Sequence, residues 1–340
     1  MKAYSLHGIN NLKYEDVDYP ECQTGWSIVK VKSAGICSSD ISRIFIKGTY
    51  HFPTIPGHEF SGVVAKVADK ENEALLGEKV GVFPLIPCQK CDQCAEGHYE
   101  MCSNYDYIGS RRDGGFAEYV AVPIWNLVTL TDAISFEEAA MMEPFAVALH
   151  AIKQAEIKKG DTIAIIGTGM IAFAAAQWAK KAGAVVTVLG RSFEKRKFAE
   201  SIADLKYEII DLCKDEFDVV LEAVGSNISI EKGINIAKSS GRLILMGNPE
   251  GNITLPQNTY WRILRKQLHI TGTWNSFYKH GEKSDWTTVR DALVNQELKA
   301  VPLISHRFFQ DELMKGLNLM YKHKEPYCKV MTLWNSKDED

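Results

Sequence analysis

The stretch Asp161–Ala172, "DTIAIIGTGMIA", decides the fold of this chain. Its first half is a short apolar run rich in isoleucine, which is typical of a strand buried on both faces. Its second half has the pattern G-x-G-x-x-[G/A], in which Gly167 permits a tight turn and Gly169 lets a pyrophosphate approach the backbone. A helix follows, and its N-terminus would hold the phosphates. The residues predicted to bind a dinucleotide here are Gly167, Gly169, Met170 and Ile171.

Strands and helices alternate on the C-terminal side of this stretch. The runs "VVTVLG", "FDVVLEAVG" and "GRLILMG" have the character of further buried strands, and "SFEKRKFAESI" has that of a helix. Such alternation predicts a parallel sheet with helices on both faces. On the N-terminal side, "SIVKVKSAGIC" and "FSGVVAKVA" predict strands of an irregular β domain, and Ser135 with Glu138 predicts the cap of a helix that continues through "FEEAAMMEPFAVALHAIKQAEI". An α/β protein of two domains is expected.

The end of the second predicted strand distinguishes two nicotinamide cofactors. An NAD site usually carries an acidic residue there, which binds the ribose hydroxyls of the adenosine. This chain has Gly190 at that position, followed by Arg191 and Ser192, with Arg196 one turn into the next helix. Glycine leaves room for a 2′-phosphate that these residues could bind, although Arg191 could also be a solvated loop cation. The pattern favours NADP(H) over NAD(H).

The bulk composition narrows the function. The 340 residues carry a net charge of −4 and are 46% hydrophobic, so a folded chain of two domains is expected. The lack of a basic excess argues against nucleic acid and anionic membranes as partners. The N-terminus has no signal-peptide pattern, and the apolar run Thr162–Ala179 is explained better by the strand, loop and helix above than by a membrane span. The expectation is a soluble cytoplasmic protein.

Four cysteines are clustered with the spacing C-x2-C-x2-C-x7-C. In a reducing compartment such a cluster is more typical of metal ligands than of disulfides, and its spacing suits a tetrahedral zinc ion. Four thiolates would close the coordination shell, so this zinc would be structural. The predicted ligands are Cys88, Cys91, Cys94 and Cys102.

A catalytic zinc, by contrast, needs three protein ligands and one open position. Candidate ligands are Cys37 in "GICSSD", His58 and Glu59 in "PGHEF", and Glu143 in "MMEPF". Each of these alone is more typical of a buried cysteine or of surface charge. Only their combination suggests a site.

Several motifs follow one another in the order found in a known family. "GICSSD", "PGHEFSGVV", the four-cysteine cluster, "DGGFAEYV", "MEPFAVALH" and "GTGMIA" resemble the zinc-containing medium-chain dehydrogenases, and "YDYIGSRRDGGFAEY" is similar to galactitol-1-phosphate-type polyol-phosphate dehydrogenases. The resemblance implies a GroES-like catalytic domain over 1–147, with a structural-zinc lobe at about 84–108. It also implies a Rossmann domain over 148–275 and a segment 276–340 that returns to the catalytic domain.

The resemblance also implies roles for individual residues. The catalytic zinc would bind Cys37, His58 and a carboxylate from Glu59 or Glu143, and would lower the pKa of the substrate hydroxyl. Ser39 would begin a proton relay, and hydride would pass to the nicotinamide. Further cofactor contacts are expected at Gly225, Gly247 and Lys329.

The chain departs from the family in two ways. The acid of an NAD site is missing, although the polyol-phosphate relatives use NAD. The segment "ADLKYEIIDLCKDEFDVVLEAVGS" is also short, so one Rossmann helix is expected to be trimmed.

The substrate is the least determined prediction. Arg111 and Arg112 suit bidentate phosphate binding, but they could also form a surface or subunit contact. Further substrate candidates are Arg43, Lys47, Tyr50, Trp274 and Asn275. The leading hypothesis is an NADP(H)-preferring, zinc-dependent polyol-phosphate dehydrogenase, active as a homodimer or homotetramer. The alternatives are a dehydrogenase of an unphosphorylated polyol, a simple secondary alcohol or threonine, and a non-catalytic cofactor-binding relative.

Overall fold

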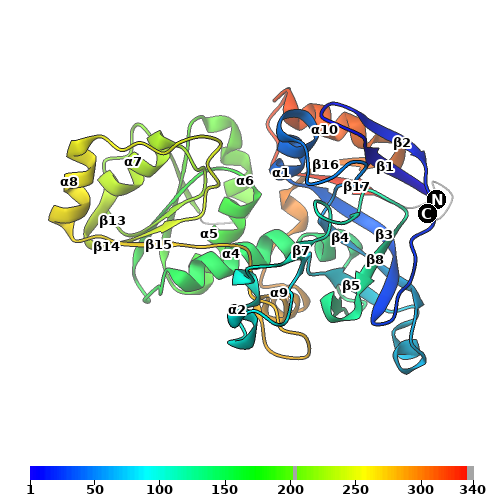
Figure 1. The fold of residues 1–340 in the computed structure, drawn as a ribbon. Coiled ribbons are helices and arrows are strands. Elements are labelled where there is room, and N and C mark those ends of the chain that lie inside the picture. Colours follow the sequence, from blue (N-terminus) through cyan, green and yellow to red (C-terminus); the bar gives the residue numbers. More distant parts are fainter. Residues whose placement is uncertain (202–204, 335–340) are drawn as a thin grey trace. The chain divides into compact units, whose positions relative to one another are not determined.

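The computed structural model describes residues 1–201 and 205–334, and the chain divides into two units (Figure 1). Unit 1 joins Met1–Glu143 to Phe277–Asp340, and unit 2 is Pro144–Ser276. The predicted domain boundaries lie after residues 147 and 275. Within the described ranges, no helix is both long and apolar enough to cross a bilayer.

Unit 2 contains a six-stranded parallel sheet. Its strands are β10 (Thr162–Ile166), β11 (Val185–Gly190), β12 (Lys206–Ile209), β13 (Phe217–Glu222), β14 (Ala237–Leu245) and β15 (His269–Gly272). They lie in the order β12-β11-β10-β13-β14-β15, which is the Rossmann order, so the predicted parallel sheet is confirmed. Between β12 and β13, residues 210–212 form a turn and residues 213–216 have no regular secondary structure, as expected for a trimmed helix.

Helices cover this sheet (Figure 1). They are α5 (Met170–Lys181), α6 (Arg196–Ser201), α7 (Asn227–Ile236) and α8 (Gln257–Lys266). Helix α5 approaches β10 and β11 closely because the residues it buries include five alanines, among them Ala172 of the glycine-rich loop. The remaining core lies between α7 and the central strands, where Ile234 packs near Val220 and Leu243.

Unit 1 contains a mostly antiparallel sheet. Its strands in spatial order are β16 (Ile304–Phe309), β17 (Lys329–Leu333), β3 (Trp26–Ile36), β4 (Glu59–Val67), β5 (Lys79–Val82) and β9 (Leu127–Thr129), with β8 (Tyr119–Pro123) paired to β3. Strand β17 pairs antiparallel with β3, so the C-terminal segment completes the sheet that the N-terminal segment begins.

Shorter elements surround this sheet. They are the hairpin β1 (Lys2–Leu6) and β2 (Leu12–Asp16), the pair β6 (Leu85–Ile86) and β7 (Asp106–Tyr107), the helices α1 (Ser38–Ser42), α2 (Asp92–Ala95), α3 (Phe136–Ala140), α9 (Asp285–Val294) and α10 (Leu313–Tyr321), and the π-helix η1 (Arg43–Lys47). Helix α4 (Met142–Gln154) begins at the end of the first segment of unit 1, and most of its residues belong to unit 2. Short 3₁₀ segments occur at Lys70–Leu75, Tyr99–Met101, Ile124–Asn126, Phe193–Lys195, Val301–Leu303 and Gln310–Glu312.

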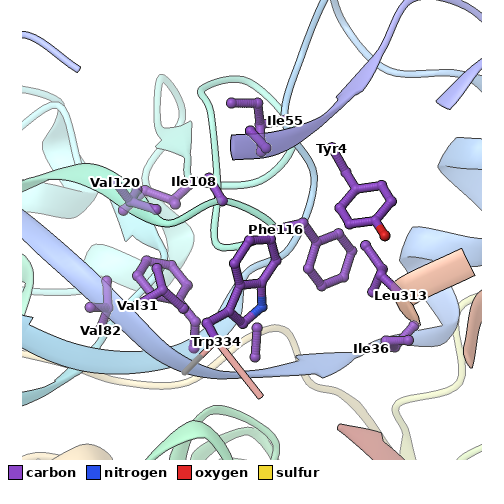
Figure 2. Packing of buried hydrophobic residues seen from close by; sticks show 14 of the residues in the cluster. Tyr4, Val31, Ile36, Ile55, Val82, Ile108, Phe116, Val120, Leu313 and Trp334 are labelled. Atoms are coloured by element: carbon purple, nitrogen blue, oxygen red, sulfur yellow. The ribbon is translucent and has the colours of Figure 1, made fainter. Parts of the chain in front are cut away.

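The core of unit 1 draws on both ends of the chain. Figure 2 shows Tyr4, Phe116, Leu313 and Trp334 among the side chains packed together. The indole of Trp334 donates a hydrogen bond to Thr332, so its only polar group is satisfied inside the core.

The predicted helix cap at Ser135 is confirmed, but the helix is shorter than expected. The Ser135 hydroxyl accepts from the Glu138 N–H, and the Glu138 carboxylate accepts from the Ser135 N–H at 2.9 Å. The predicted single helix ends at Met141, and α4 starts anew. Pro144 lies in the first turn of α4, where its missing N–H costs no helical hydrogen bond.

Candidate active site and metal centres

The pairing of β3 with β4 brings three predicted metal ligands together. Gly35 lies opposite Glu59 in the antiparallel register, so Cys37, just after β3, and His58, just before β4, come to the same edge of the sheet. One ligand atom each from Cys37, His58 and Glu59 lies within 4.8 Å of the others. A side chain at position 35 would not fit, because its Cβ would lie 2.5 Å from the Glu59 Oε2.

Asp40 supports this trio, and it was not among the predicted site residues. It is fully buried, its Oδ2 accepts from the Cys37 N–H at 2.9 Å, and its Oδ1 lies 3.4 Å from the His58 Nδ1. Burial lowers the pKa of His58, but the charges of Asp40 and Cys37 outweigh it and hold that pKa well above its ordinary value. A carboxylate behind a histidine is the arrangement that orients metal-bound imidazoles. The only indication of Asp40 in the sequence is the motif "CSSD", in which Cys37 and Asp40 have the spacing of a helix capping box.

Lys329 lies at the same cluster. Its ammonium forms a buried ion pair with the Glu59 Oε2 and lies 3.4 Å from the Ile36 carbonyl oxygen. Burial lowers the pKa of Lys329, yet the charges of Glu59 and Cys37 raise it on balance. The predicted contact of Lys329 with a cofactor stays a prediction, because the nearest charged partner in the structure is Glu59.

Glu143 lies beside the trio rather than within it. It is buried in the first turn of α4 and interacts electrostatically with His58, Glu59 and Lys329. Its pKa is raised to about 7, chiefly by burial, with an opposing effect of His58 and a further increase from Glu59. Both predicted carboxylates are therefore at the site, with Glu59 nearer to Cys37 and His58.

These donors fit a zinc ion with three protein ligands. A thiol, an imidazole and a carboxylate within 4.8 Å of one another form the mixed donor set that catalytic zinc sites use while one position stays open. Glu143 also interacts electrostatically with the buried carboxyls of Glu59 and Asp40, and a dication would compensate their charge.

Ser39 and Arg43 lie next to the trio on α1 and η1. The Arg43 Nη1 donates to the Ser39 hydroxyl at 2.8 Å and lies 3.4 Å from the Asp40 Oδ1. The ring of Tyr107 lies against His58, with centroids 5.8 Å apart, and the pKa of Tyr107 is raised, first by burial and then by Glu143. Tyr107 was also missed, because its place depends on the fold of the cysteine lobe.

The four-cysteine cluster forms a separate lobe between β6 and β7. One sulfur from each cysteine lies within 4.8 Å of the others, with Cys88 4.0 Å from Cys94 and Cys91 3.9 Å from Cys102. A tetrahedral zinc with Zn–S bonds of about 2.3 Å holds its sulfurs about 3.8 Å apart, so the cluster fits this ion. Backbone N–H groups of Cys94 and Ser103 lower the pKa of Cys91 to about 5, which favours the thiolate.

The two predicted phosphate ligands have protein partners. The Arg111 guanidinium lies between the rings of Tyr50 and Tyr105, 4.5 and 4.3 Å from their centroids, and donates to the Tyr105 carbonyl oxygen. Arg112 forms an ion pair with Asp106 and lies over the Trp26 ring. Lys47 and Tyr50 are exposed.

The glycine-rich loop of unit 2 has the geometry that a dinucleotide requires. Gly167 adopts a φ of +131°, which favours glycine. Gly169 is the N-cap of α5, and a Cβ there would meet nothing within 4 Å, so its backbone face is open to a phosphate. Met170 and Ile171 form the first turn of α5, where free N–H groups favour anions.

The other predicted cofactor residues lie along the carboxyl edge of the same sheet. Gly190 ends β11, and Arg191, Ser192 and Arg196 are exposed after it, with Arg196 paired to Glu200 at 2.9 Å.

Gly225 and Gly247 pack against each other. A Cβ on Gly247 would overlap the Gly225 N–H, so both glycines are needed for this backbone contact. Trp274 is exposed, and Asn275 accepts from the Ser276 N–H at 2.9 Å.

Comparisons with known proteins agree with this architecture. The family model "Alcohol dehydrogenase GroES-like domain" matches residues 23–132, and "Zinc-binding dehydrogenase" matches 171–295. Galactitol 1-phosphate 5-dehydrogenase of Escherichia coli K12 is 34% identical over 291 residues, which cover 82% of this chain and 84% of the relative. The crystal structure of galactitol-1-phosphate dehydrogenase from Escherichia coli has a TM-score of 0.90 and 31% identity over 98% of this chain and 100% of that one.

Two further structures carry cofactors. One, from Sinorhizobium meliloti 1021, is described as a candidate zinc-binding dehydrogenase bound to NADP, with a TM-score of 0.88 and 26% identity over 98% of this chain and 99% of that one. The other is a short chain alcohol dehydrogenase from Escherichia coli CFT073 complexed with NADH, with a TM-score of 0.89 and 26% identity over the same shares. With its GroES-like and zinc-binding domains and its mixed-donor trio, the chain belongs to the zinc-dependent alcohol and polyol dehydrogenases, which are oxidoreductases acting on CH–OH groups.

Proposed function

We propose that this enzyme interconverts a secondary alcohol of a polyol phosphate and the corresponding ketose phosphate, with NADP(H) as its preferred hydride carrier. The observation that carries the substrate class is Arg43, a guanidinium held beside Ser39 and the metal-ligand trio. The similarity to galactitol 1-phosphate 5-dehydrogenase supports the same class.

The Arg43 guanidinium has N–H groups that remain available to a bound ligand. Its Nη1 contacts Ser39 and Asp40, whereas its Nε and Nη2 form no hydrogen bond to any residue in the described part of the chain. The side chain is only 23% exposed, so a phosphate bound there would lose little of the interaction to solvent screening. A guanidinium binds phosphate oxygens in bidentate fashion. Arg111 and Arg112 are weaker candidates, because each is already held by an aromatic ring and an acceptor.

The residues of the trio and their neighbours have different roles in the reaction. Held by Cys37, His58 and a carboxylate from Glu59 or Glu143, zinc would supply the Lewis acidity that favours a deprotonated alcohol near neutral pH. Asp40 orients His58. The Ser39 oxygen accepts from Arg43 with one lone pair, so its other lone pair can accept the substrate proton while its own proton passes to water.

The cofactor preference follows from the end of β11. Gly190 lacks the acidic side chain that would repel a 2′-phosphate at this position. Arg191 and Ser192, which could bind the phosphate, follow it directly in the chain. The loop at Gly167 and Gly169 would hold the pyrophosphate. Titration of the protein with NADPH and NADH, followed by nicotinamide fluorescence, tests this preference, and tighter NADH binding would reject it.

A substrate panel tests the phosphate requirement. We expect kcat/KM for polyol phosphates to exceed that for the matching polyols, and Arg43→Gln to lower this ratio by about 100-fold, since charge-assisted bonds are lost. Arg290→Gln, which removes a surface guanidinium paired with Asp291, should leave the ratio unchanged. A ratio that Arg43→Gln leaves intact would show that the substrate is a neutral polyol or that its phosphate binds elsewhere.

We also propose that copies of the chain associate through unit 2. Strand β15 is an edge strand with exposed residues, and α8 exposes Tyr260, Trp261 and Leu264. Unpaired edges and contiguous apolar faces are surfaces that a second copy can cover. Sedimentation velocity would measure the resulting dimer or tetramer.

A further inference from the structure

The space that a side chain at position 190 would need is filled by a neighbouring side chain. A Cβ added to Gly190 would overlap the hydroxyl of Tyr207 and would lie 2.7 Å from the Tyr207 Cζ and from the Thr168 Cγ2. Tyr207 belongs to β12, where it pairs with Val188, and its side chain extends along β11 to the carboxyl end. The volume in which NAD sites hold their acidic side chain is therefore occupied by a phenol.

Tyr207 is held in this place by a specific contact. Its hydroxyl donates to the Ser192 carbonyl oxygen at 2.6 Å, across fifteen residues of sequence. The ring is half-buried, and burial raises the pKa of Tyr207, so the hydroxyl keeps its proton at neutral pH. The phenol thus joins β12 to the loop that carries Arg191 and Ser192.

From this arrangement we infer that Tyr207 is a specificity-determining residue for the cofactor. It excludes an acidic side chain from position 190, and its hydroxyl binds the 2′-phosphate of NADP(H) together with Arg191 and Ser192. The inference rests on the proposed NADP(H) preference, and it adds a residue that the motif around Gly190 does not contain.

The chemistry of a phenol suits this role. Its single proton is shared with a neutral carbonyl in the free protein, and a phosphate dianion is the stronger acceptor. The Tyr207 hydroxyl can rotate so that it donates to the phosphate instead of the Ser192 carbonyl oxygen. Because Ser192 is exposed, water can then donate to that carbonyl oxygen. A cofactor with a ribose hydroxyl in place of the phosphate gains less from the same contact, because the acceptor is uncharged.

Tyr207→Phe removes the hydroxyl and keeps the ring. We expect the Kd for NADPH to rise about tenfold or more, equivalent to about 1.4 kcal/mol, while the Kd for NADH changes by less than about threefold. Tyr19→Phe, an exposed tyrosine of unit 1, is the matched control and should change neither value. Fluorescence titration of the purified protein measures binding without turnover.

Substitutions at position 190 test whether Tyr207 excludes an acidic side chain from this position. Gly190→Asp alone should bind NADH poorly, because the new side chain meets Tyr207, whereas Gly190→Asp/Tyr207→Ala should bind NADH at least about tenfold more tightly than the single variant. Equal NADH binding by the single and double variants would overturn the exclusion. An unchanged NADPH to NADH ratio in Tyr207→Phe, with wild type still preferring NADPH, would overturn the role of Tyr207 alone. A wild-type preference for NADH would instead reject the proposed cofactor.

Discussion

The two metal-ligand clusters of unit 1 are built in opposite ways. The cysteine lobe takes all four ligands from fifteen consecutive residues and closes them between two short paired strands. The trio takes Cys37 from one strand end and His58 and Glu59 from another, and a lysine 270 residues further along the chain neutralises Glu59. The first cluster is a local structure that needs only its own loop, whereas the second exists only when the sheet is complete. Local clusters suit a structural role, and assembled ones can leave a coordination position open for chemistry.

Removal of Cys37 gives the largest expected effect. Cys37→Ser should lower kcat by about 1000-fold or more, because the trio loses its thiolate and with it the metal. Cys22→Ser, which alters a thiol hydrogen-bonded to the Trp26 carbonyl oxygen, is the control and should keep full activity. Metal analysis should find one zinc per chain in Cys37→Ser and two in the control. A variant with two zincs and wild-type turnover would contradict the assignment of Cys37.

Removal of Cys91 should affect stability first. Cys91→Ser should lower the free energy of unfolding by roughly 4 kcal/mol or more, because metal binding by a small lobe contributes directly to its folding. Chemical denaturation with metal analysis measures the effect, and residual folded protein should retain most of its turnover. A Cys91→Ser protein that is stable and holds both metals but has no activity would reverse the roles of the two clusters.

Glu143 gives a smaller, pH-dependent effect. Its pKa in the folded protein, about 7, lies above its ordinary value of 4.5, so ionisation of the buried carboxyl lowers stability as pH rises from about 4.5 to about 7. After mild chelation that empties the trio, Glu143→Gln should be more stable than wild type by up to about 3 kcal/mol at pH 8 and equal to it near pH 4.5. Thermal unfolding at both pH values measures this difference.

The comparison with metal-loaded protein is the control for this prediction. A bound dication compensates the carboxylate, so the advantage of Glu143→Gln at pH 8 should shrink or vanish when zinc is present. An equal advantage with and without zinc would show that Glu143 does not face the metal.

The sequence predicts the local features of this enzyme well and the assembled ones poorly. The four-cysteine lobe and the loop at Gly167 depend on spacing within a few residues, and both are present in the structure. Cys37, His58 and Glu59 could be proposed from residue type and family resemblance, and the register of β3 and β4 brings them together.

What the sequence did not predict depends on that register and on burial. Asp40 is a helix-cap residue in sequence and becomes a support of His58 only because β4 returns beside it. Tyr207 lies seventeen residues beyond Gly190, and only the pairing of β11 with β12 shows that it fills the space there. Arg111 and Arg112 illustrate the converse, since adjacent residues in a sequence can take separate partners in the fold.

The place of β17 has a consequence for the order in which the chain can fold. This strand is internal to its sheet, between β16 and β3, although it is the last strand in the part of the chain that the structure describes. During synthesis unit 2, which is one continuous segment, can close its contacts before β17 has left the ribosome, whereas unit 1 must wait for it. Until then β3 lacks one neighbour and Glu59 has no Lys329. The metal-ligand trio can therefore gain Lys329 only after β17 has been synthesised, whereas unit 2 can fold before that point.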